Sequence, residues 1–500
     1  MDTVHTLFHF MARPHPPTYG RTSMFRPRLI IAGLNGGTGK TITSLGTTRA
    51  WIRKGLAVKP FKKGPDYIDA KWLGLAARCP ATNLDPYLLP QDMLRALFRT
   101  SVEPYAGALI EGNRGLFDGK DLSGSCSTAE LARILRTPVV LAMDCTKMTR
   151  TAAAIVSGIA GFEPDIHIAG VILNRTANDR HRAMLRQTIE HYTGIPVLGA
   201  LPKMRTNPIP ERHMGLISDQ EYTPEDDPLE TVADLISEHC DVDALWQIAC
   251  TAPAVPDAPP LWDMVPKAPG DEPPVRIGYV RDAALWFYYE ENLQALRHAG
   301  AELIELSLLS PDPWPALDAL YLGGGFPETL AERIAENTPI RDHIRHLADS
   351  GLPIYAECGG FMVLSRSLVY KGCEYPMTGV FPVSTHLCDR PQGLGYIDAT
   401  VTLENPYHPA GSVIKGHEFH YSKCVVDAGA QPAFGLRMDR GFGMVADCDG
   451  LIRNNVFASY THLFALGEPH WAVNMVLAAR RHRSEMRGAD HLVPPAPGRS

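Results

Sequence analysis

The sequence lacks several features that would assign it to a special class of protein. No apolar run in its 500 residues approaches the roughly 20 residues that span a bilayer. The formal net charge is −7, which gives no electrostatic reason to expect a nucleic-acid partner. Residues 1–27 contain no continuous apolar stretch before a small-residue cleavage site, so a secretory signal is not expected. We expect a cytoplasmic protein that enters no membrane, with residues 1–27 as a disordered extension.

Paired cysteines are also missing. The chain has ten cysteines, and none forms a C-x-x-C pair. Neither a zinc cluster nor a disulfide framework is therefore indicated. Scattered thiols in a chain of this size fit a reducing cytoplasm. Most of them are expected to be small buried side chains, whereas Cys358 stands in a different sequence context.

Apolar runs in the first half recur with the order of an α/β domain. With 45% apolar and 21% charged residues, the composition is that of a globular protein, and the length predicts two or three domains. Repeated strands separated by helical stretches predict a mainly parallel sheet covered by helices over residues 28–249. The expected strands are 29–34, 56–61, 106–112, 138–144, 168–174 and 195–201.

A change of composition predicts where this domain ends. Residues 250–274 are rich in proline and show no sustained periodicity, as in an interdomain linker. A second α/β pattern covers residues 275–482, and the segment 483–500 is expected to be a frayed tail. The expected strands of the second domain are 275–280, 319–324, 353–358, 416–422 and 456–462. The fold class is therefore α/β, with two doubly wound domains.

A glycine-rich loop follows the first strand. GLNGGTGKT (33–41) leads into a helix-compatible stretch, so backbone N–H groups and the start of a helix can face one anion. Lys40 can reach β- and γ-phosphates, and the hydroxyl of Thr41 can ligate Mg²⁺. The first glycine lies one residue earlier than in G-x-x-x-x-G-K-[ST]. The expected ATP-binding residues are Gly33, Gly36, Gly37, Thr38, Gly39, Lys40 and Thr41.

A nucleotide site of this kind also needs carboxylates for its metal ion. Glu111 ends an apolar strand and is the expected Mg²⁺ ligand together with Thr41. Asp118 follows in the next loop, and Asp66 and Asp69 stand close to two lysines. Ligands of parallel sheets lie at this carboxyl edge. These three aspartates are candidates for binding substrate or metal, and solvated loop residues are the alternative for each.

The second domain contains a candidate nucleophile. PIYAECGGFMVL (353–364) places Cys358 between a short strand and a helix-like run, where a sharp turn projects the side chain out of the sheet. A helix N-terminus behind it is expected to lower the thiol pKa. The backbone at Gly359, and the turn GGGFPE (323–328) around Gly325, are the expected donors to an oxyanion.

A thiol nucleophile needs a base, and His462 at the end of a late strand is the expected one. A lone histidine is more often a packed or surface residue, so the Cys358 turn is what raises its importance. His417 and His420 are alternatives for the same role. Their segment, GHEFHYS (416–422), is not H-E-x-x-H, so a zinc protease is not supported.

With both sites in view, the chain resembles the cobyrinic acid a,c-diamide synthase family from about residue 28 to 480. The loop at 33–41 is similar to the shifted phosphate loop that this family shares with dethiobiotin synthetases. The motifs that carry the resemblance are FKKGPDYID, NLDPYLL, EGNRGLFDG, GSCSTAELA and PERHMGL in the first half, and RDAALWFYYEENL, LGGGFPE, AECGGFMVL, GHEFHYS and ASYTHL in the second.

The resemblance implies a glutamine-hydrolysing carbon–nitrogen ligase. Its first domain, P-loop NTPase-like, would use ATP and Mg²⁺ to phosphorylate a tetrapyrrole carboxylate. Its second, a flavodoxin-like class I glutamine amidotransferase domain, would release ammonia from L-glutamine with Cys358 and His462. Two residues after the histidine, where such triads usually have a carboxylate, stands Phe464, which implies a Cys–His dyad. A homodimer is compatible with this interpretation.

Several positions depart from the family pattern and leave the substrate open. Leu34 and Asn35 replace the usual loop residues, and the stretch after His462 differs from the HLHF ending. The first expectation is amidation of the a- and c-acetates of cobyrinate, in cobalamin biosynthesis. The same reaction on sirohaem or a sirohydrochlorin-type ring is the alternative. From another class, the alternative is a P-loop regulatory ATPase with an inactive amidotransferase domain.

Overall fold

The computed structural model describes residues 25–204, 206, 208–209, 211–212, 215–216 and 227–490. Most of the predicted extension 1–27, much of the PERHMGL motif and residues 491–500 lie outside the described residues. The chain divides into two compact units. The first holds the chain up to Leu84 and Leu94–Ala258, and the second holds Asp85–Met93 and the chain from Pro259 onward. The change from one unit to the other after Ala258 falls inside the predicted linker 250–274.

The first unit is a seven-stranded parallel sheet with the strand order β3-β2-β4-β1-β5-β6-β7. Its strands are β1 (Arg28–Gly33), β2 (Val58–Lys63), β3 (Thr82–Leu84), β4 (Gly107–Glu111), β5 (Val139–Asp144), β6 (Ile168–Thr176) and β7 (Val197–Pro202), followed by the short pair β8 (Glu211–Arg212) and β9 (Gly215–Leu216). The helices of this half are α1 (Lys40–Arg53), α2 (Tyr67–Ala77), α3 (Gln91–Val102), α4 (Thr128–Leu135), α5 (Arg150–Phe162), α6 (Asp179–Thr193), α7 (Pro228–His239) and α8 (Val242–Cys250).

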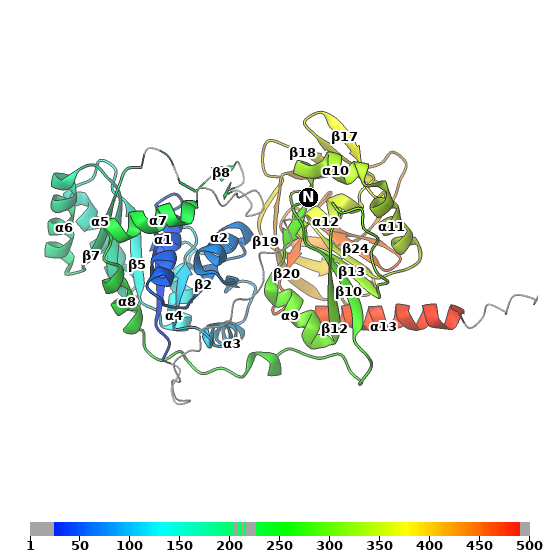
Figure 1. The fold of residues 1–500 in the computed structure, drawn as a ribbon, viewed down its shortest axis with the longest axis horizontal. Helices are drawn as coiled ribbons and strands as arrows, with labels where there is room; N and C mark the ends of the chain where they lie inside the picture. Colours follow the sequence, from blue (N-terminus) through cyan, green and yellow to red (C-terminus); the bar gives the residue numbers. More distant parts are fainter. Residues whose placement is uncertain are drawn as a thin grey trace, which may run out of the picture. The chain divides into compact units, whose positions relative to one another are not determined.

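Apolar strands and amphipathic helices build the core of this unit. Leu29 and Ile31 of β1 pack with Trp51 of α1, Ile236 of α7 and Leu245 of α8 in one buried cluster. Helices α1 and α7 lie side by side on that face (Figure 1). The core fixes the start of α1 at the carboxyl end of β1, where ligands of parallel sheets bind.

The second unit contains a ten-stranded mixed sheet with the order β12-β10-β13-β15-β24-β23-β22-β19-β20-β25. Its strands and those of two small sheets are β10 (Val275–Val280), β11 (Leu285–Phe287), β12 (Ala301–Leu306), β13 (Ala319–Leu322), β14 (Gly324–Gly325), β15 (Ile354–Glu357), β16 (Ser367–Tyr370), β17 (Cys373–Pro376), β18 (Val383–Leu387), β19 (Gly393–Val401), β20 (Val413–His420), β21 (Ser422–Val426), β22 (Ala433–Arg440), β23 (Cys448–Arg453), β24 (Val456–Ser459) and β25 (His462–Leu463). The helices are η2 (Leu261–Asp263), α9 (Glu290–Ala299), η3 (Pro327–Leu330), α10 (Ala331–Glu336), α11 (Thr338–Asp349), α12 (Gly359–Leu364) and α13 (His470–Asp490).

Side-chain alternation separates the two faces of this sheet. Leu320 of β13 and Ile354 of β15 belong to a cluster with residues of α11 and α12. Their chain neighbours Tyr321 and Tyr355 belong to another cluster, with Trp471 of α13. Successive residues of a strand point to opposite faces. Alternate residues of β15 therefore lie on the same face of the sheet.

The structure confirms an α/β fold and adds elements that were not predicted. Strand β3 is too short to give a periodic signal. From β24 onward through β23, β22, β19, β20 and β25, neighbouring strands run antiparallel, which the βαβ interpretation did not anticipate. Helix α13 continues to Asp490, so the first part of the segment 483–500 is helical where a frayed tail was predicted.

Candidate active sites

The glycine-rich loop joins β1 to the start of α1, as the sequence indicated. Gly39 has a φ of 97° and stands directly before the helix. A Cβ atom at Gly39 would collide with the side chain of Asn174, so both the backbone conformation and the space require glycine. The side-chain amide of Asn174 donates to the carbonyl of Thr38 at 3.0 Å, which holds the loop against β6.

Lys40 is the first residue of α1 and is held inside the loop. Its ammonium donates to the carbonyl of Asn35 at 2.7 Å. Burial lowers the pKa of Lys40, and the negative charge of Glu111 partly opposes this shift. Asn35, Gly36 and Gly37 are exposed. The loop therefore presents an ammonium and backbone N–H groups close to solvent, where a polyphosphate can reach them.

Glu111 is the centre of a buried charged cluster next to the loop. Its Oε1 accepts hydrogen bonds from the hydroxyl of Thr41 at 2.8 Å and from the ammonium of Lys62 at 2.9 Å. Lys62 also donates to Asp69. Asp66 is the N-cap of α2 and accepts from the N–H of Asp69 at 2.9 Å. Glu111, Asp69 and Asp66 thus lie around Lys62. The sequence showed only that a lysine stands close to the two aspartates in the chain.

The charged groups in this cluster shift one another's pKa values. Burial, followed by the charge of Asp69, raises the pKa of Asp66 to about 7. Burial also raises the pKa of Glu111, although Lys62 opposes it. Burial alone would lower the pKa of Lys62, but Asp69 and Glu111 outweigh it and raise that pKa. Lys62 therefore stays charged, and its charge opposes the effect of burial on the pKa values of Asp66 and Glu111.

Asp118 lies apart from this cluster, on an exposed turn. Its carboxylate accepts from the N–H of Gly115 at 2.9 Å, and the N–H of Leu116 donates to the carbonyl of Gly33 at 2.8 Å. The turn is thus tied to the phosphate loop. Its charge raises the pKa of Lys40, less than Glu111 does. Asp118 is placed to contact a ligand bound by the phosphate loop, but it is not part of the cluster around Glu111.

The oxygen atoms around Glu111 fit a magnesium ion. Its Oε2 is buried and accepts no hydrogen bond, and its Oε1 is shared with Thr41. Among the described residues, no group of three or more His, Cys, Asp or Glu side chains could hold a metal by itself. Mg²⁺ commonly takes one or two protein oxygens together with phosphates and water, so one carboxylate and one hydroxyl suffice.

In the second unit, Cys358 occupies a strained turn between β15 and α12. Its backbone has φ 46° and ψ −100°, which a residue with a Cβ atom adopts only when its surroundings impose it. The N–H of Cys358 donates to the carbonyl of Ser459 at 2.7 Å. A Cβ atom at Gly360 would collide with the carbonyl of Leu322. The turn therefore forces the thiol out of the sheet, as the strand–Cys–Gly–Gly pattern predicted.

The glycine turn after β13 lies against this elbow. The N–H of Gly360 donates to the carbonyl of Gly323 at 3.0 Å. A Cβ atom at Gly359 would lie 2.9 Å from the backbone nitrogen of Gly325. The hydroxyl of Tyr288 accepts from the N–H of Gly323 at 2.8 Å and so fixes the turn. The two predicted oxyanion segments, at Gly325 and Gly359, are thus brought together beside Cys358.

Burial determines the protonation of the thiol. Cys358 is 4% exposed, and burial, with the charge of Glu328 next, raises its pKa above the ordinary value. The prediction that a helix N-terminus lowers this pKa is wrong, because desolvation outweighs the dipole of α12, which has only six residues. Burial also raises the pKa of Glu328 to about 7. Cys358 is therefore a neutral thiol at rest, and it could act as a nucleophile only if a base removed its proton.

His462 lies beside the same glycine turn. A Cβ atom at Gly324 would collide with Cε1 of the imidazole. On the neighbouring strand, His417 is directly opposite His462, and the two rings stack at 4.9 Å and 17°. Nδ1 of His462 lies 3.6 Å from Oε2 of Glu357. Glu357 was not predicted, although it stands directly before Cys358, because its carboxylate meets His462 only in the folded sheet.

The comparisons with known proteins cover both halves of the chain. Residues 29–217 match the model of a CobQ/CobB/MinD/ParA nucleotide binding domain, and residues 276–470 match that of a CobB/CobQ-like glutamine amidotransferase domain. A cobyrinate a,c-diamide synthase of Magnetococcus marinus is 42% identical over 450 residues, which are 89% of this chain and 96% of the relative. One from Archaeoglobus fulgidus is 37% identical over 463 residues, 91% and 98% of the two chains.

This chain belongs to the cobyrinate a,c-diamide synthase family. The resemblance seen in the sequence motifs is confirmed across both halves. No helix among the described residues is long and apolar enough to cross a membrane.

The other two histidines of this family member lie on opposite faces of β20. Burial, and then the neighbouring His462, lower the pKa of His417 well below the ordinary value. His417 therefore stays neutral beside His462. The ring of His420 contacts the carbonyl of Ser422 at 2.7 Å and stacks on Tyr460. Since residues three apart on a strand point to opposite sides, only His417 faces His462.

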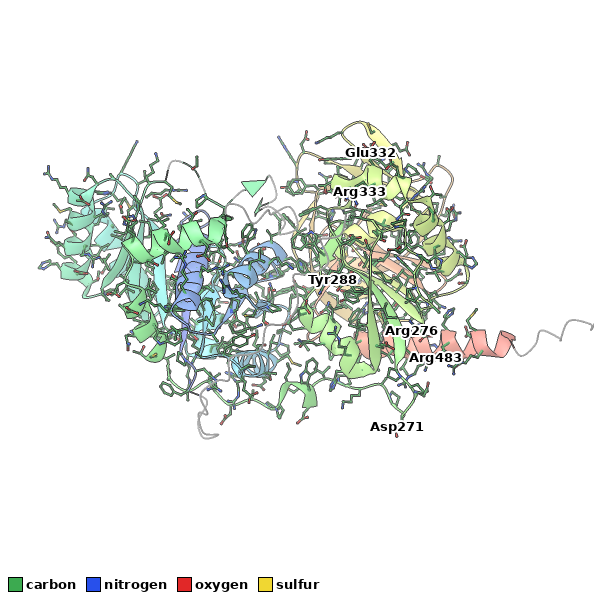
Figure 2. All side chains as sticks on the ribbon, in the orientation of Figure 1. Asp271, Arg276, Tyr288, Glu332, Arg333 and Arg483 are labelled. Atoms are coloured by element: carbon green, nitrogen blue, oxygen red, sulfur yellow. The ribbon has the colours of Figure 1, made fainter. Side chains whose placement is uncertain are left out.

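The aromatic run before α9 has a structural role in the second unit. Phe287, Tyr288 and Tyr289 are buried, and Figure 2 labels Tyr288 within that unit. The ring of Tyr289 packs against Phe464 at 4.6 Å. These rings therefore pack inside the second unit, and the hydroxyl of Tyr288 holds the glycine turn. Phe464 occupies the usual carboxylate position with a buried ring.

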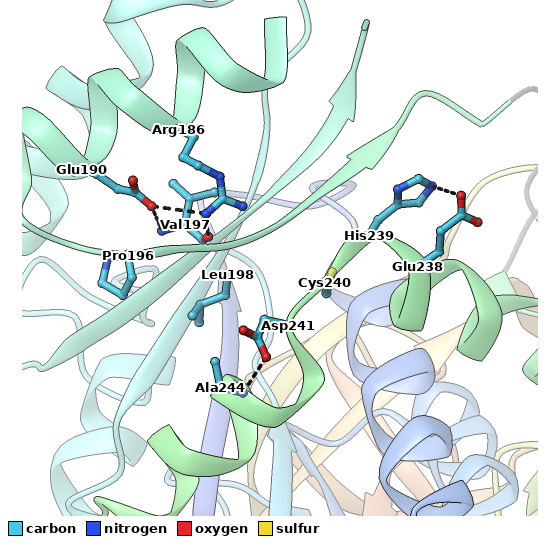
Figure 3. A pocket seen from close by; sticks show the side chains of 10 residues that line it. All are labelled: Arg186, Glu190, Pro196, Val197, Leu198, Glu238, His239, Cys240, Asp241 and Ala244. Atoms are coloured by element: carbon cyan, nitrogen blue, oxygen red, sulfur yellow. Dashed lines mark hydrogen bonds and ion pairs between the residues drawn. The ribbon is translucent and has the colours of Figure 1, made fainter. Parts of the chain in front are cut away.

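A hollow in the first unit lies away from the phosphate loop (Figure 3). Val197 and Leu198, at the amino end of β7, line it. The phosphate loop follows the carboxyl end of β1, so the two are at opposite edges of a parallel sheet. Glu190 accepts from the N–H of Val197 at 3.1 Å and pairs with Arg186. The polar groups of this hollow bond to one another, and we assign it no part in either site.

Proposed function

We propose that this chain is an ATP- and glutamine-dependent enzyme that converts the a- and c-acetate carboxylates of cobyrinate into carboxamides. The observation that carries the proposal is the similarity to cobyrinate a,c-diamide synthases over 89% of the chain, which includes both candidate sites. Its substrates are ATP, L-glutamine and a tetrapyrrole carboxylate. A ring with neighbouring acetates would be amidated twice.

In the first unit, the proposed reaction activates the carboxylate. A carboxylate resists nucleophiles, and transfer of a phosphoryl group from ATP turns one of its oxygens into a leaving group. The loop 33–41 would hold the phosphates, with Lys40 neutralising charge on the group being transferred. Thr41 and Glu111 would hold Mg²⁺, which supplies charge neutralisation to the phosphates when bound. Asp66, Asp69 and Asp118 remain candidates for binding substrate or metal.

In the second unit, the proposed reaction releases ammonia. His462 takes the proton of the Cys358 thiol, and the sulfur attacks the side-chain amide carbon of glutamine. The carbon–sulfur bond forms and the carbon–nitrogen bond breaks, while His462 returns the proton to the leaving ammonia. Water then hydrolyses the thioester to glutamate. N–H groups at Gly325 and Gly359 would stabilise the oxyanion in both steps.

The choice of substrate is tested by offering cobyrinate, sirohydrochlorin and sirohaem side by side to the purified protein with ATP and glutamine. Mass spectrometry of the products should show two successive replacements of a hydroxyl by an amino group on cobyrinate. A single replacement, or turnover of sirohaem alone, would overturn the choice of cobyrinate and leave the amidotransferase mechanism standing.

The same assay separates the enzyme from a regulatory ATPase. An inactive amidotransferase domain would release no glutamate from glutamine when ATP and cobyrinate are present. We further propose a cytoplasmic location, which suits ten free cysteines, and a homodimer. Analytical ultracentrifugation checks the assembly, and a monomer at micromolar concentration would contradict it.

A further inference from the structure

Glu357 is a buried carboxylate in an apolar layer of the second unit. It ends β15 and has the strand parity of Tyr355, so it points to the sheet face that carries Tyr321 and Trp471. Its exposure is 0%. A carboxylate placed there loses its hydration, and proteins retain such a group only where it is hydrogen-bonded or paired.

Two of the partners of Glu357 belong to the strand that carries His462. Oε1 accepts from the N–H of Leu463, the residue after the histidine, at 3.2 Å. Oε2 accepts from the hydroxyl of Tyr321 at 3.2 Å and lies 3.6 Å from Nδ1 of His462. Asn292 completes the arrangement, since its side chain donates to the carbonyl of Leu463 at 2.9 Å and accepts from the N–H of Ala465 at 2.8 Å. The backbone after the base is therefore held on both sides.

The carboxyl group of Glu357 faces the ring of His462 from β15. From β20 the ring faces His417, which stays neutral because burial lowers its pKa. Tyr321 on β13 also stays neutral, because burial raises its pKa. Two residues after the base, Phe464 supplies no carboxylate. The carboxyl group beside the ring of His462 thus comes from the residue before Cys358.

We propose that Glu357 is the positioning residue of the glutaminase site, which orients His462 through Nδ1 and stabilises its protonated form. This inference rests on the proposed glutaminase function of Cys358 and His462. A carboxylate beside Nδ1 favours the tautomer with a proton on that nitrogen, and it leaves Nε2 as the base for the thiol. The site then works as a triad whose acid and nucleophile are adjacent in the chain.

The test is Glu357→Gln, which keeps the shape of the side chain and removes its charge. Glutamate release is measured at saturating ATP and cobyrinate, and amidation is measured separately with ammonium salts. We expect kcat for glutamine hydrolysis to fall about 10²-fold, the usual scale of general-base assistance, with an unchanged KM for glutamine. The acid limb of the pH profile should move to lower pH, because the protonated ring loses its carboxylate. Ammonium-dependent amidation should stay intact.

Glu418→Gln is the matched control. Glu418 is 1% exposed, belongs to the same sheet and lies 3.6 Å from a nitrogen of His420, but it faces away from His462. It accepts from the N–H groups of Phe442 and Gly443. We expect this variant to keep kcat within about threefold and to leave the acid limb in place. A loss as large as that of Glu357→Gln would overturn the proposal.

Glu357→Asp keeps the charge on a shorter side chain and guards against misfolding. It should recover part of the kcat lost in the glutamine variant and restore the acid limb. An unmoved acid limb in Glu357→Gln, or no recovery in Glu357→Asp, would reduce Glu357 to a packing role. If the wild-type protein amidates no tetrapyrrole but hydrolyses glutamine, the proposed substrate fails while this test still decides the role of Glu357.

Discussion

The two candidate sites differ in how much of each is exposed to solvent. In the first unit, Lys40 is 8% exposed and lies beneath the exposed loop residues Asn35, Gly36 and Gly37. A buried lysine balances the acids behind it. In the second unit, Cys358 and His462 are 4% and 1% exposed. A polyphosphate has to enter and leave its site, whereas a thioester has to be kept from uncontrolled reactions until water is admitted.

This difference sets the protonation of each site. In the first unit Lys62 keeps its charge, because Asp69 and Glu111 outweigh its burial and raise its pKa. The thiol of the second unit is kept neutral by the same kind of burial. At rest, the first site therefore holds a buried charged lysine, whereas Cys358 of the second is a neutral thiol that a base would have to deprotonate. The following changes should separate the two.

The largest effect is expected from Cys358→Ala. Removing the nucleophile should reduce glutamine-dependent amidation by a factor on the order of 10⁶, while concentrated ammonium salts still support the reaction. Glutamate release and amide formation are both measured. Cys424→Ala, which removes another buried thiol of this unit, should keep both activities. Glutamate release by Cys358→Ala would show that another residue is the nucleophile.

Lys40→Ala should impair the candidate ATP site and therefore reduce amidation with either glutamine or ammonium as the nitrogen source. Product formation should fall by more than about 10³-fold with glutamine or ammonium, because a preorganised charge on the transferring phosphoryl group is lost. Lys54→Ala is the control at the end of the same helix, where the lysine pairs with Asp243. Normal turnover by Lys40→Ala with ammonium would remove the loop from the mechanism.

Lys62→Met tests whether the acids of the first unit depend on their lysine. Leaving Glu111 and Asp69 unpaired should lower the free energy of unfolding by roughly 3–5 kcal/mol. Burial already raises the pKa of Glu111, and loss of Lys62 raises it further. The folded state therefore retains protons that the unfolded state releases, so the loss should grow from pH 5 to pH 8.

Urea unfolding at both pH values measures this change. Lys59→Met is the control on the same strand, since the ammonium of Lys59 donates to the carbonyl of Pro80. A loss of stability in Lys62→Met that does not depend on pH would mean that the lysine only fills space.

The smallest effect concerns Glu328 and the thiol. Because the charge of Glu328 raises the pKa of Cys358, Glu328→Gln should increase alkylation of the thiol by iodoacetamide at pH 8 about threefold. The pKa of Glu328 is raised from 4.5 to about 7. Its contribution to stability is therefore lost as pH rises between these values, and the glutamine variant should lack that decline.

Mass spectrometry of the alkylated Cys358 and thermal unfolding from pH 4 to pH 8 measure these two effects. An unchanged alkylation rate would show that the charge of Glu328 does not reach the thiol. That result would leave burial as the cause of the raised pKa.

Local signals were sufficient for the phosphate loop and the cysteine elbow. Residues 33–41 and 353–364 each combine a strand, glycines and a helix start, and such turns are encoded by neighbouring residues. The predicted strand 275–280 coincides with β10, and the predicted strand 456–462 covers β24 and the first residue of β25. The roles of these residues remain proposals, although their placement agrees with the sequence patterns.

The other features of the two sites depend on contacts between residues that are far apart in the sequence. The sequence by itself determined the α/β class, the two glycine turns and the choice of Lys40, Glu111, Cys358 and His462 as candidates. Only the tertiary structure decided that Glu357 faces His462, because β15 and β25 are separated by more than a hundred residues. It also decided that burial keeps Cys358 protonated, since desolvation depends on everything packed around a group and has no local signal.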